Sequence, residues 1–111
     1  MKALKKAAVI SLSAGMALGL TACSSGTSMD GKTHLTFQIW DVAQRDGMQQ
    51  VCDAYTAKNP DVVIEVQVTS WSEYWTKLEA SAISNQMPDI FWMHTNEILK
   101  YADYGKLADL T

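Results

Sequence analysis

From residue 35 onward, the apolar residues of the chain switch between the two-residue period of a strand and the longer period of a helix. Residues 35–40 (LTFQIW) alternate apolar and polar positions before Asp41, which predicts a strand that ends in a polar loop. Residues 44–58 then carry apolar side chains at helical spacing and stop at Asn59-Pro60, because a residue before proline is pushed out of the helical region. The apolar stripe of this helix comprises Met48, Val51, Cys52 and Tyr55, while Gln49, Gln50 and Asp53 point away.

A second strand and helix follow in the same order. Residues 62–68 (VVIEVQV) are dense in β-branched side chains, which predicts a strand. Ser70 and Glu73 have the spacing of a capping box, in which the Ser70 hydroxyl accepts from the Glu73 amide and the Glu73 carboxylate reaches back. The helix that they open extends to about Asn85, before Pro88. One face of this helix carries Trp71, Trp75, Leu78 and Ala82.

The third unit has a strand without alternation. Residues 89–94 (DIFWMH) form a nearly unbroken apolar run, as a central parallel strand buried on both faces needs. Thr95 or Asn96 can cap a third helix through about Tyr104, and Gly105 stands where a left-handed residue is wanted. Three strand-helix units predict an α/β fold with a partial doubly wound parallel sheet, and right-handed crossovers place the first strand between the other two.

The first 22 residues have the layout of a secretory signal peptide. Lysines at positions 2, 5 and 6 precede a small and apolar run over residues 7–20, which is short for a membrane span of about 20 residues. The alternative is a transmembrane anchor, and Ser11, Ser13 and two glycines in the run weaken it. The segment therefore predicts export.

The residues Leu20-Thr21-Ala22-Cys23 resemble the lipobox of bacterial lipoproteins. In a lipobox the cysteine thiolate takes a diacylglyceryl group and the peptide is cut just before it, so Cys23 is the predicted lipidation site. Two acyl chains suffice to hold a protein on a bilayer. Residues 24–33 (SSGTSMDGKT) are too poor in apolar groups to form a core, so residues 23–33 are expected to be a flexible tether and 34–111 the folded part.

Charge and motif content disfavour several classes of function. Because three of the nine basic residues lie in the first six positions, the rest of the chain carries 12 acidic against six basic residues, and nucleic acid is not an expected partner. Cys52 has no disulfide partner if Cys23 is lipidated, and neither histidine lies near a cysteine at metal-ligand spacing. The sequence also lacks a phosphate-binding glycine loop and a nucleophile elbow, so no cofactor, metal or catalytic residue is assigned.

The loops after the three strands hold the candidate binding residues, because ligands of open α/β sheets lie beyond the carboxyl ends of the strands. The aromatic residues of these loops can stack on a ligand, and their Asp, Asn and Glu groups can form hydrogen bonds with it. The residues so selected are Trp40, Asp41, Ser70, Trp71, His94, Thr95, Asn96 and Glu97. Trp75 and Trp92 are assigned to the core, Trp71 can pack or stack, and Asp41 and Asn96 have capping as a rival role.

Several of these motifs together resemble a known family. The chain combines the lipobox with 55-YTAKNP-60, with 71-WSEYWTKL-78, with 87-MPDIFW-92 and with 101-YADYGKL-107. This series is similar to the start of extracellular solute-binding lipoproteins of bacterial ABC importers, in particular the carbohydrate-binding subgroup. The resemblance implies a two-lobed periplasmic-binding-protein-like fold, of which residues 34–111 are the N-terminal part of the first lobe, and a chain cut short before the second lobe.

The same resemblance implies the function. It predicts a non-enzymatic protein on the outer face of the cell membrane that captures a sugar or oligosaccharide and delivers it to ABC permease subunits. Sugar contacts carry over to Trp40, Asp41, His94 and Asn96, and Trp71 joins them from its place at the helix start. The alternatives are a lipoprotein that binds a polyamine or a metal, and a lipid-anchored hydrolase.

Overall fold

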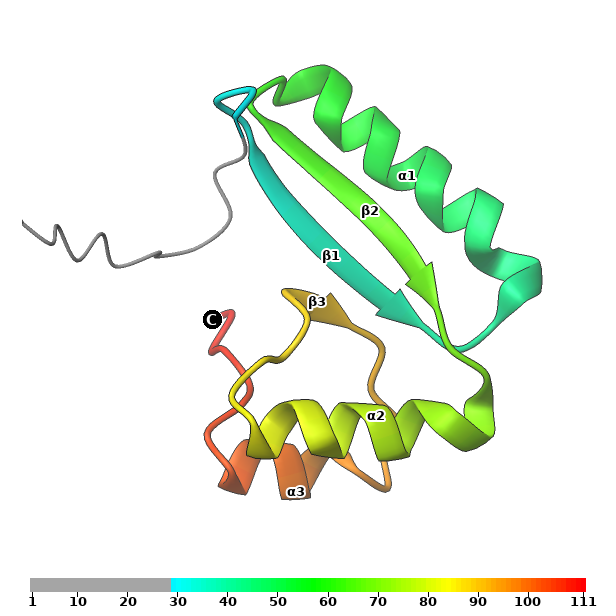
Figure 1. Ribbon diagram of the computed structural model, residues 1–111, viewed down its shortest axis with the longest axis vertical. Helices are drawn as coiled ribbons and strands as arrows, with labels where there is room; N and C mark the ends of the chain where they lie inside the picture. Colours follow the sequence, from blue (N-terminus) through cyan, green and yellow to red (C-terminus); the bar gives the residue numbers. More distant parts are fainter. Residues whose placement is uncertain (1–28) are drawn as a thin grey trace, which may run out of the picture.

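The computed structural model describes residues 29–111, so residues 1–22, Cys23 and most of the expected tether lie outside the described residues. Three parallel strands form one open sheet in the order β2-β1-β3 (Figure 1). β1 (Thr33–Ile39) and β2 (Val62–Val68) pair along their whole length, while β3 (Ile90–Phe91) pairs with two residues of β1. The predicted parallel sheet and its strand order are confirmed.

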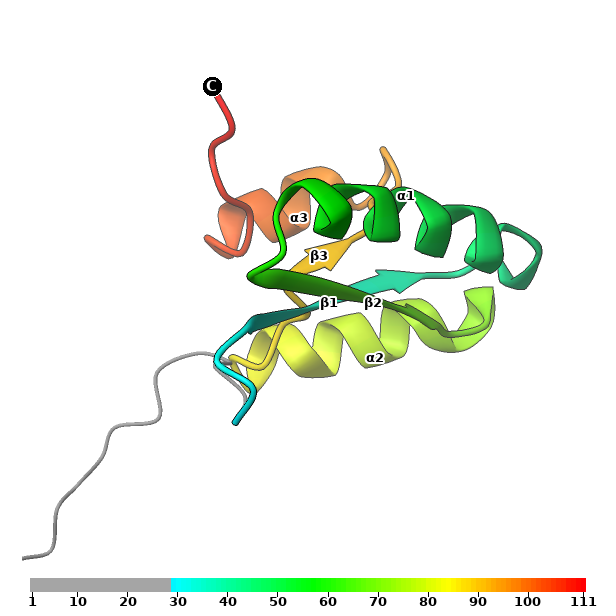
Figure 2. The ribbon, with the colours of Figure 1, turned by 90° about the horizontal axis from the view of Figure 1, so that it is seen from above.

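The helices cover the sheet on both faces. A short 3₁₀ turn, η1 (Val42–Gln44), leads into α1 (Arg45–Lys58), which lies on one face, and α2 (Trp71–Ile83) lies on the other (Figure 2). α3 (Ile98–Asp103) packs beside α2. None of the helices in residues 29–111 is both long and apolar enough to cross a membrane.

The ends of α1 and α3 agree with the sequence, but the starts of α2 and α3 do not. α3 begins at Ile98, after Glu97, and is not capped by Thr95 or Asn96 as predicted. α1 ends at Lys58, before Asn59-Pro60, and Gly105 has the expected positive φ of 64° after α3. The predicted capping box does not form as such. Instead, the Ser70 hydroxyl donates to the Glu73 carboxylate at 3.0 Å, and the Glu73 amide donates to the backbone carbonyl of Ser70.

The two faces of the sheet have separate cores. The first core cluster lies under α1 and is built from small and aliphatic side chains, namely Ile39, Cys52, Ile64 and Val66. The second core cluster lies under α2 and α3 and comprises Tyr74, Leu78, Ala82 and Tyr101. Burial of apolar area in these two clusters is the main driving force for the fold.

The orientation of α1 differs from the predicted stripe. Cys52 is buried as expected, but Val51 and Tyr55 are 63% and 50% exposed. Gln49, expected to point away, lies against the free edge of β2 instead. Its side-chain amide donates to the Ile64 carbonyl and accepts from the Val66 amide, both at 2.9 Å. Compared with the predicted orientation, α1 is therefore rotated about its axis. Gln49, which has two backbone partners, faces the sheet at a position where the periodicity predicted an apolar residue.

β3 is much shorter than the predicted strand over residues 89–94. At its start, the Thr36 amide and hydroxyl donate to the Asp89 carboxylate at 2.8 and 3.0 Å. In a longer parallel ladder that amide would donate to the carbonyl of Pro88. The Asp89 side chain thus ends the pairing of β3 with β1 on this side, and Ile90 is left partly exposed rather than buried on both faces.

Candidate functional site

The carboxyl ends of the strands bring three loops to one end of the sheet (Figure 1). Trp40 and Asp41 follow β1, Trp71 opens α2 directly after the loop that follows β2, and His94 and Asn96 lie between β3 and α3. Because the strands are parallel, all three loops emerge on the same side.

Six aromatic rings from these segments form one group, the aromatic cluster, which comprises Trp40, Trp71, Tyr74, Trp75, Trp92 and His94. Trp40 lies at its centre, with ring centroids 5.0 Å from Trp92, 5.1 Å from Tyr74 and 5.2 Å from Trp71. These three contacts are edge-to-face, the geometry that aromatic quadrupoles favour. Trp40 is therefore half-buried and holds the other rings in place.

Trp71 is the more open ring of the cluster and lines a pocket. It is 50% exposed, and its ring makes edge-to-face contacts with Trp75 at 5.4 Å and His94 at 5.8 Å. The pocket has a volume of about 180 Å³ and is lined by Trp71, Trp75, His94, Asn96 and Glu97. Its wall combines aromatic faces with an imidazole, an amide and a carboxylate.

Backbone and side-chain contacts arrange the polar groups of this pocket. The backbone amide of Asn96 donates to His94 Nδ1 at 3.3 Å, so Nδ1 is the acceptor and, in the neutral ring, Nε2 carries the proton. The Glu97 carboxylate lies 3.0 Å from Lys100 Nζ and raises the pKa of that amine. The pocket therefore presents both hydrogen-bond donors and acceptors.

Asp41 lies at the start of η1 and is engaged with its own loop. Its Oδ1 accepts from the Ala43 amide at 2.9 Å, and its Oδ2 accepts from the Gln44 side chain at 3.0 Å. These are the contacts of a helix cap. Since a carboxylate has about four acceptor positions, each oxygen keeps one for a further donor.

The structure brings together, around the aromatic cluster, four of the five residues to which the sequence assigned sugar contacts, namely Trp40, Trp71, His94 and Asn96. Trp75, assigned from the sequence to the core, also lines the pocket. The spacing of Trp71 and Trp75, one helical turn apart, is the signal from which a shared role could have been predicted. Trp92 has the packing role that was expected of it, against the first core cluster and the Trp40 ring.

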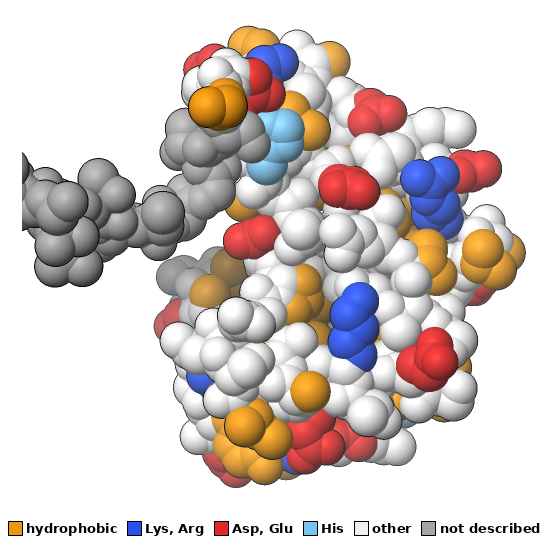
Figure 3. All heavy atoms as spheres, in the orientation of Figure 1, with side chains coloured by type: hydrophobic (Ala, Val, Ile, Leu, Met, Phe, Trp, Pro, Cys, Tyr) orange, Lys and Arg blue, Asp and Glu red, His pale blue; other side chains and the backbone are white. Residues whose placement is uncertain are grey.

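Charged groups at this end of the molecule do not assemble a metal site. Within residues 29–111 no three His, Cys, Asp or Glu side chains lie close enough to share a metal ion. Acidic and basic side chains are interspersed over the face shown in Figure 3.

Comparisons with known proteins agree with this fold. Residues 41–111 match the family model of the bacterial extracellular solute-binding protein. A curated relative, an uncharacterized lipoprotein in the oleD 5′ region of Streptomyces antibioticus, is 29% identical over 94 residues, which cover 83% of this chain and 21% of the relative.

Two solved structures are similar over most of the described residues. UspC of M. tuberculosis has a TM-score of 0.68 and 26% identity, over 70% of this chain and 20% of its own. The ABC substrate-binding protein Lmo0181 of Listeria monocytogenes, in complex with cycloalternan, has a TM-score of 0.63 and 29% identity, over 71% of this chain and 20% of its own. The chain thus spans about a fifth of the length of each.

Proposed function

The chain belongs to the bacterial extracellular solute-binding protein family, and from this premise we propose that residues 29–111 contribute one wall of a carbohydrate-binding site. The observation that carries the proposal is the pocket between Trp71 and the segment 94–97, where aromatic faces and polar groups converge at the carboxyl end of a parallel sheet.

The chemistry of this wall fits a sugar ring. The exposed Trp71 face can cover the apolar C–H side of the ring, while the His94 Nε2 proton and the side-chain amide of Asn96 bind its hydroxyls. Trp40 supports the Trp71 ring through their edge-to-face contact, and Asp41 offers its remaining acceptor positions at the rim. The similarity to a substrate-binding protein in complex with cycloalternan supports this assignment.

The partners and location follow from the same premise. We propose that the protein is exported, is held on the outer face of the cell membrane by lipid on Cys23, and passes its ligand to ABC permease subunits. The lipoprotein among its relatives supports the anchor.

The anchor is tested in cells fed a tagged fatty acid. Cys23→Ala is expected to abolish labelling and leave an unprocessed precursor, because the acyl acceptor is lost. Cys52→Ala is the matched control, since that thiol is buried under α1 and is expected to leave labelling unchanged. Labelling that survives Cys23→Ala contradicts the anchor.

The ligand class is tested by titrating the chain with cycloalternan, maltotetraose, spermidine and zinc chloride while recording the indole N–H signals of the tryptophans. The two sugars are expected to shift the Trp71 signal, and Trp71→Ala is expected to weaken binding by about 1–3 kcal/mol, roughly tenfold to a hundredfold. Tyr55→Ala is the matched control, because this ring is equally exposed but lies on α1.

The other outcomes separate the alternatives. A response to spermidine or zinc alone contradicts a carbohydrate site and favours a polyamine or metal. Cleavage of the added oligosaccharide, followed by chromatography, contradicts a pure binding role and favours a hydrolase. A sugar response that survives Trp71→Ala contradicts the assigned wall.

A further inference from the structure

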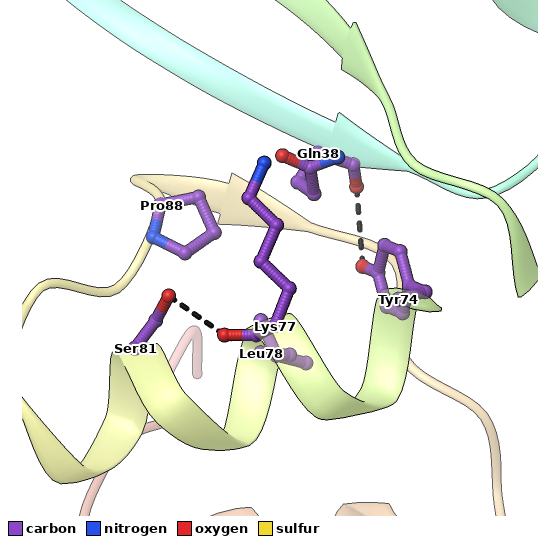
Figure 4. A pocket seen from close by; sticks show the side chains of 6 residues that line it. All are labelled: Gln38, Tyr74, Lys77, Leu78, Ser81 and Pro88. Atoms are coloured by element: carbon purple, nitrogen blue, oxygen red, sulfur yellow. Dashed lines mark hydrogen bonds between the residues drawn. The ribbon is translucent and has the colours of Figure 1, made fainter. Parts of the chain in front are cut away.

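Tyr74 joins all three segments of the candidate site through one hydroxyl. The side chain comes from the first turn of α2 and is 1% exposed. Its oxygen lies 2.7 Å from the Trp92 carbonyl and 3.2 Å from the Gln38 carbonyl, and Figure 4 shows it pointing at Gln38 from the α2 side of the sheet. Burial raises the pKa of this hydroxyl above its usual range, so it remains a donor.

The position of this hydroxyl explains why β3 ends after Phe91. The Trp92 amide still donates to the Gln38 carbonyl at 3.1 Å, as the parallel ladder requires. In the next rung, the Trp40 amide would donate to the Trp92 carbonyl. That carbonyl is bound by Tyr74 instead, and within residues 29–111 the Trp40 amide has no hydrogen-bond partner.

The place where the chain leaves the sheet determines where the following residues lie. A strand that continued to His94 would keep residues 92–94 beside β1 and carry Asn96 past the end of the sheet. Because the ladder stops at Trp92, the chain turns at this point, and His94 comes to lie 5.8 Å from the Trp71 ring. The ring of Tyr74 also contacts Trp40 and Trp75, both at 5.1 Å.

We propose that Tyr74 is a positioning residue: its hydroxyl takes the place of a backbone donor at the end of β3 and so places His94 and Asn96 opposite Trp71. Only the expected effect of Tyr74 on ligand binding rests on the proposed function. The geometry it describes can be measured without any ligand.

The unmodified chain provides the first test. Amide hydrogen exchange of the full chain is expected to show a protected Trp92 amide beside a fast-exchanging Trp40 amide, because only the first is paired. A Trp40 amide as protected as that of Trp92 overturns the proposal without any variant.

The second test removes the hydroxyl alone. In Tyr74→Phe the Trp92 carbonyl becomes free for the Trp40 amide, so exchange at Trp40 is expected to slow by about tenfold or more, and the His94 ring signals are expected to move as their distance from Trp71 changes. Tyr55→Phe is the matched control, since that ring is half exposed on α1. Measurement in about 1 M sucrose supports the fold of the variant.

The outcomes distinguish this proposal from the function. Unchanged Trp40 exchange and unchanged His94 signals in a folded Tyr74→Phe chain overturn the positioning role. If both change, and the unmodified chain binds neither cycloalternan nor maltotetraose, the positioning role stands and the carbohydrate site fails. If the unmodified chain binds the sugars, Tyr74→Phe is expected to weaken their binding and to leave the exposure of Trp71 to quenchers unchanged.

Discussion

The two faces of the sheet are packed by different kinds of side chain. Under α1, the first core cluster uses aliphatic and small groups, whose contacts have no preferred direction. Under α2 and α3, the second core cluster uses two buried tyrosines and shares one of them, Tyr74, with the aromatic cluster. Its ring pairs lie at defined angles, and the Tyr74 hydroxyl binds backbone carbonyls. Only the second face opens into the pocket of the candidate site.

The difference shows how one small sheet separates stability from recognition. Aliphatic packing tolerates side-chain exchange as long as volume is kept, whereas edge-to-face rings and hydrogen bonds hold their partners in a single orientation. A binding wall needs the second property. We therefore expect substitutions on the two faces to differ in how they lower stability. The variants below run from the largest expected loss in the free energy of unfolding to the smallest.

Trp40→Ala is expected to have the largest effect. Because this ring contacts four other aromatic rings, its loss is expected to lower the free energy of unfolding by about 3–5 kcal/mol. Trp71→Ala, at the open side of the same cluster, is the control and is expected to cost much less. Urea unfolding measures both, and equal losses would contradict the central place of Trp40.

Val66→Thr tests the aliphatic face. The threonine keeps the shape of valine but places a hydroxyl in the first core cluster, so a loss of about 1–3 kcal/mol is expected. Val68→Thr is matched to it, since Val68 lies two residues along the same strand and is 36% exposed. If thermal and urea melts show both variants to be neutral, the face is less strictly apolar than described.

Gln49→Ala tests the contact between α1 and the edge of β2. Losing two hydrogen bonds to the backbone is expected to cost about 1 kcal/mol and to speed hydrogen exchange at the Val66 amide. Gln50→Ala changes the same residue type at the next, exposed position of α1 and is expected to do neither. Unchanged exchange at Val66 in Gln49→Ala would show that the contact does not persist in solution.

The smallest effect is expected from Cys52, through pH. Burial raises the pKa of this thiol above the about 8.5 of a free cysteine, so the folded chain keeps the proton where the unfolded chain loses it. The free energy of unfolding is then highest below the unfolded pKa and declines as the pH rises above it towards the higher pKa of the folded state. Urea melts at several pH values should show this slope, and Cys52→Ala should remove it.

Local sequence patterns predicted the parts of the fold that depend on local physics. The bounds of β2 agree with the run of β-branched residues, and proline and glycine mark the ends of α1 and α3. The strand order followed from handedness alone. Most of the candidate residues also converge, because parallel strands carry their loops to the same end.

The features that the sequence did not predict depend on tertiary partners. The length of β3 depends on the side chains of Asp89 and Tyr74. The first accepts from the Thr36 amide and the second donates to the Trp92 carbonyl, and in both pairs the two residues are distant in sequence. The rotation of α1 depends on Gln49 finding the backbone of β2. Periodicity predicts that such polar residues face solvent, because it contains no information on their hydrogen-bond partners in the folded chain.

The contact of Gln49 with β2 also affects the tendency of copies of this chain to aggregate through their strand edges. An unpaired strand edge is a template on which a second polypeptide can add its own strand, and such addition is the first step of many aggregates. The Gln49 amide binds Ile64 and Val66, two residues apart, as one residue of a neighbouring strand would. In the middle of β2 that template is already occupied, so in the part of the chain that the structure describes the opposite side of the sheet, along β3, is the more open edge.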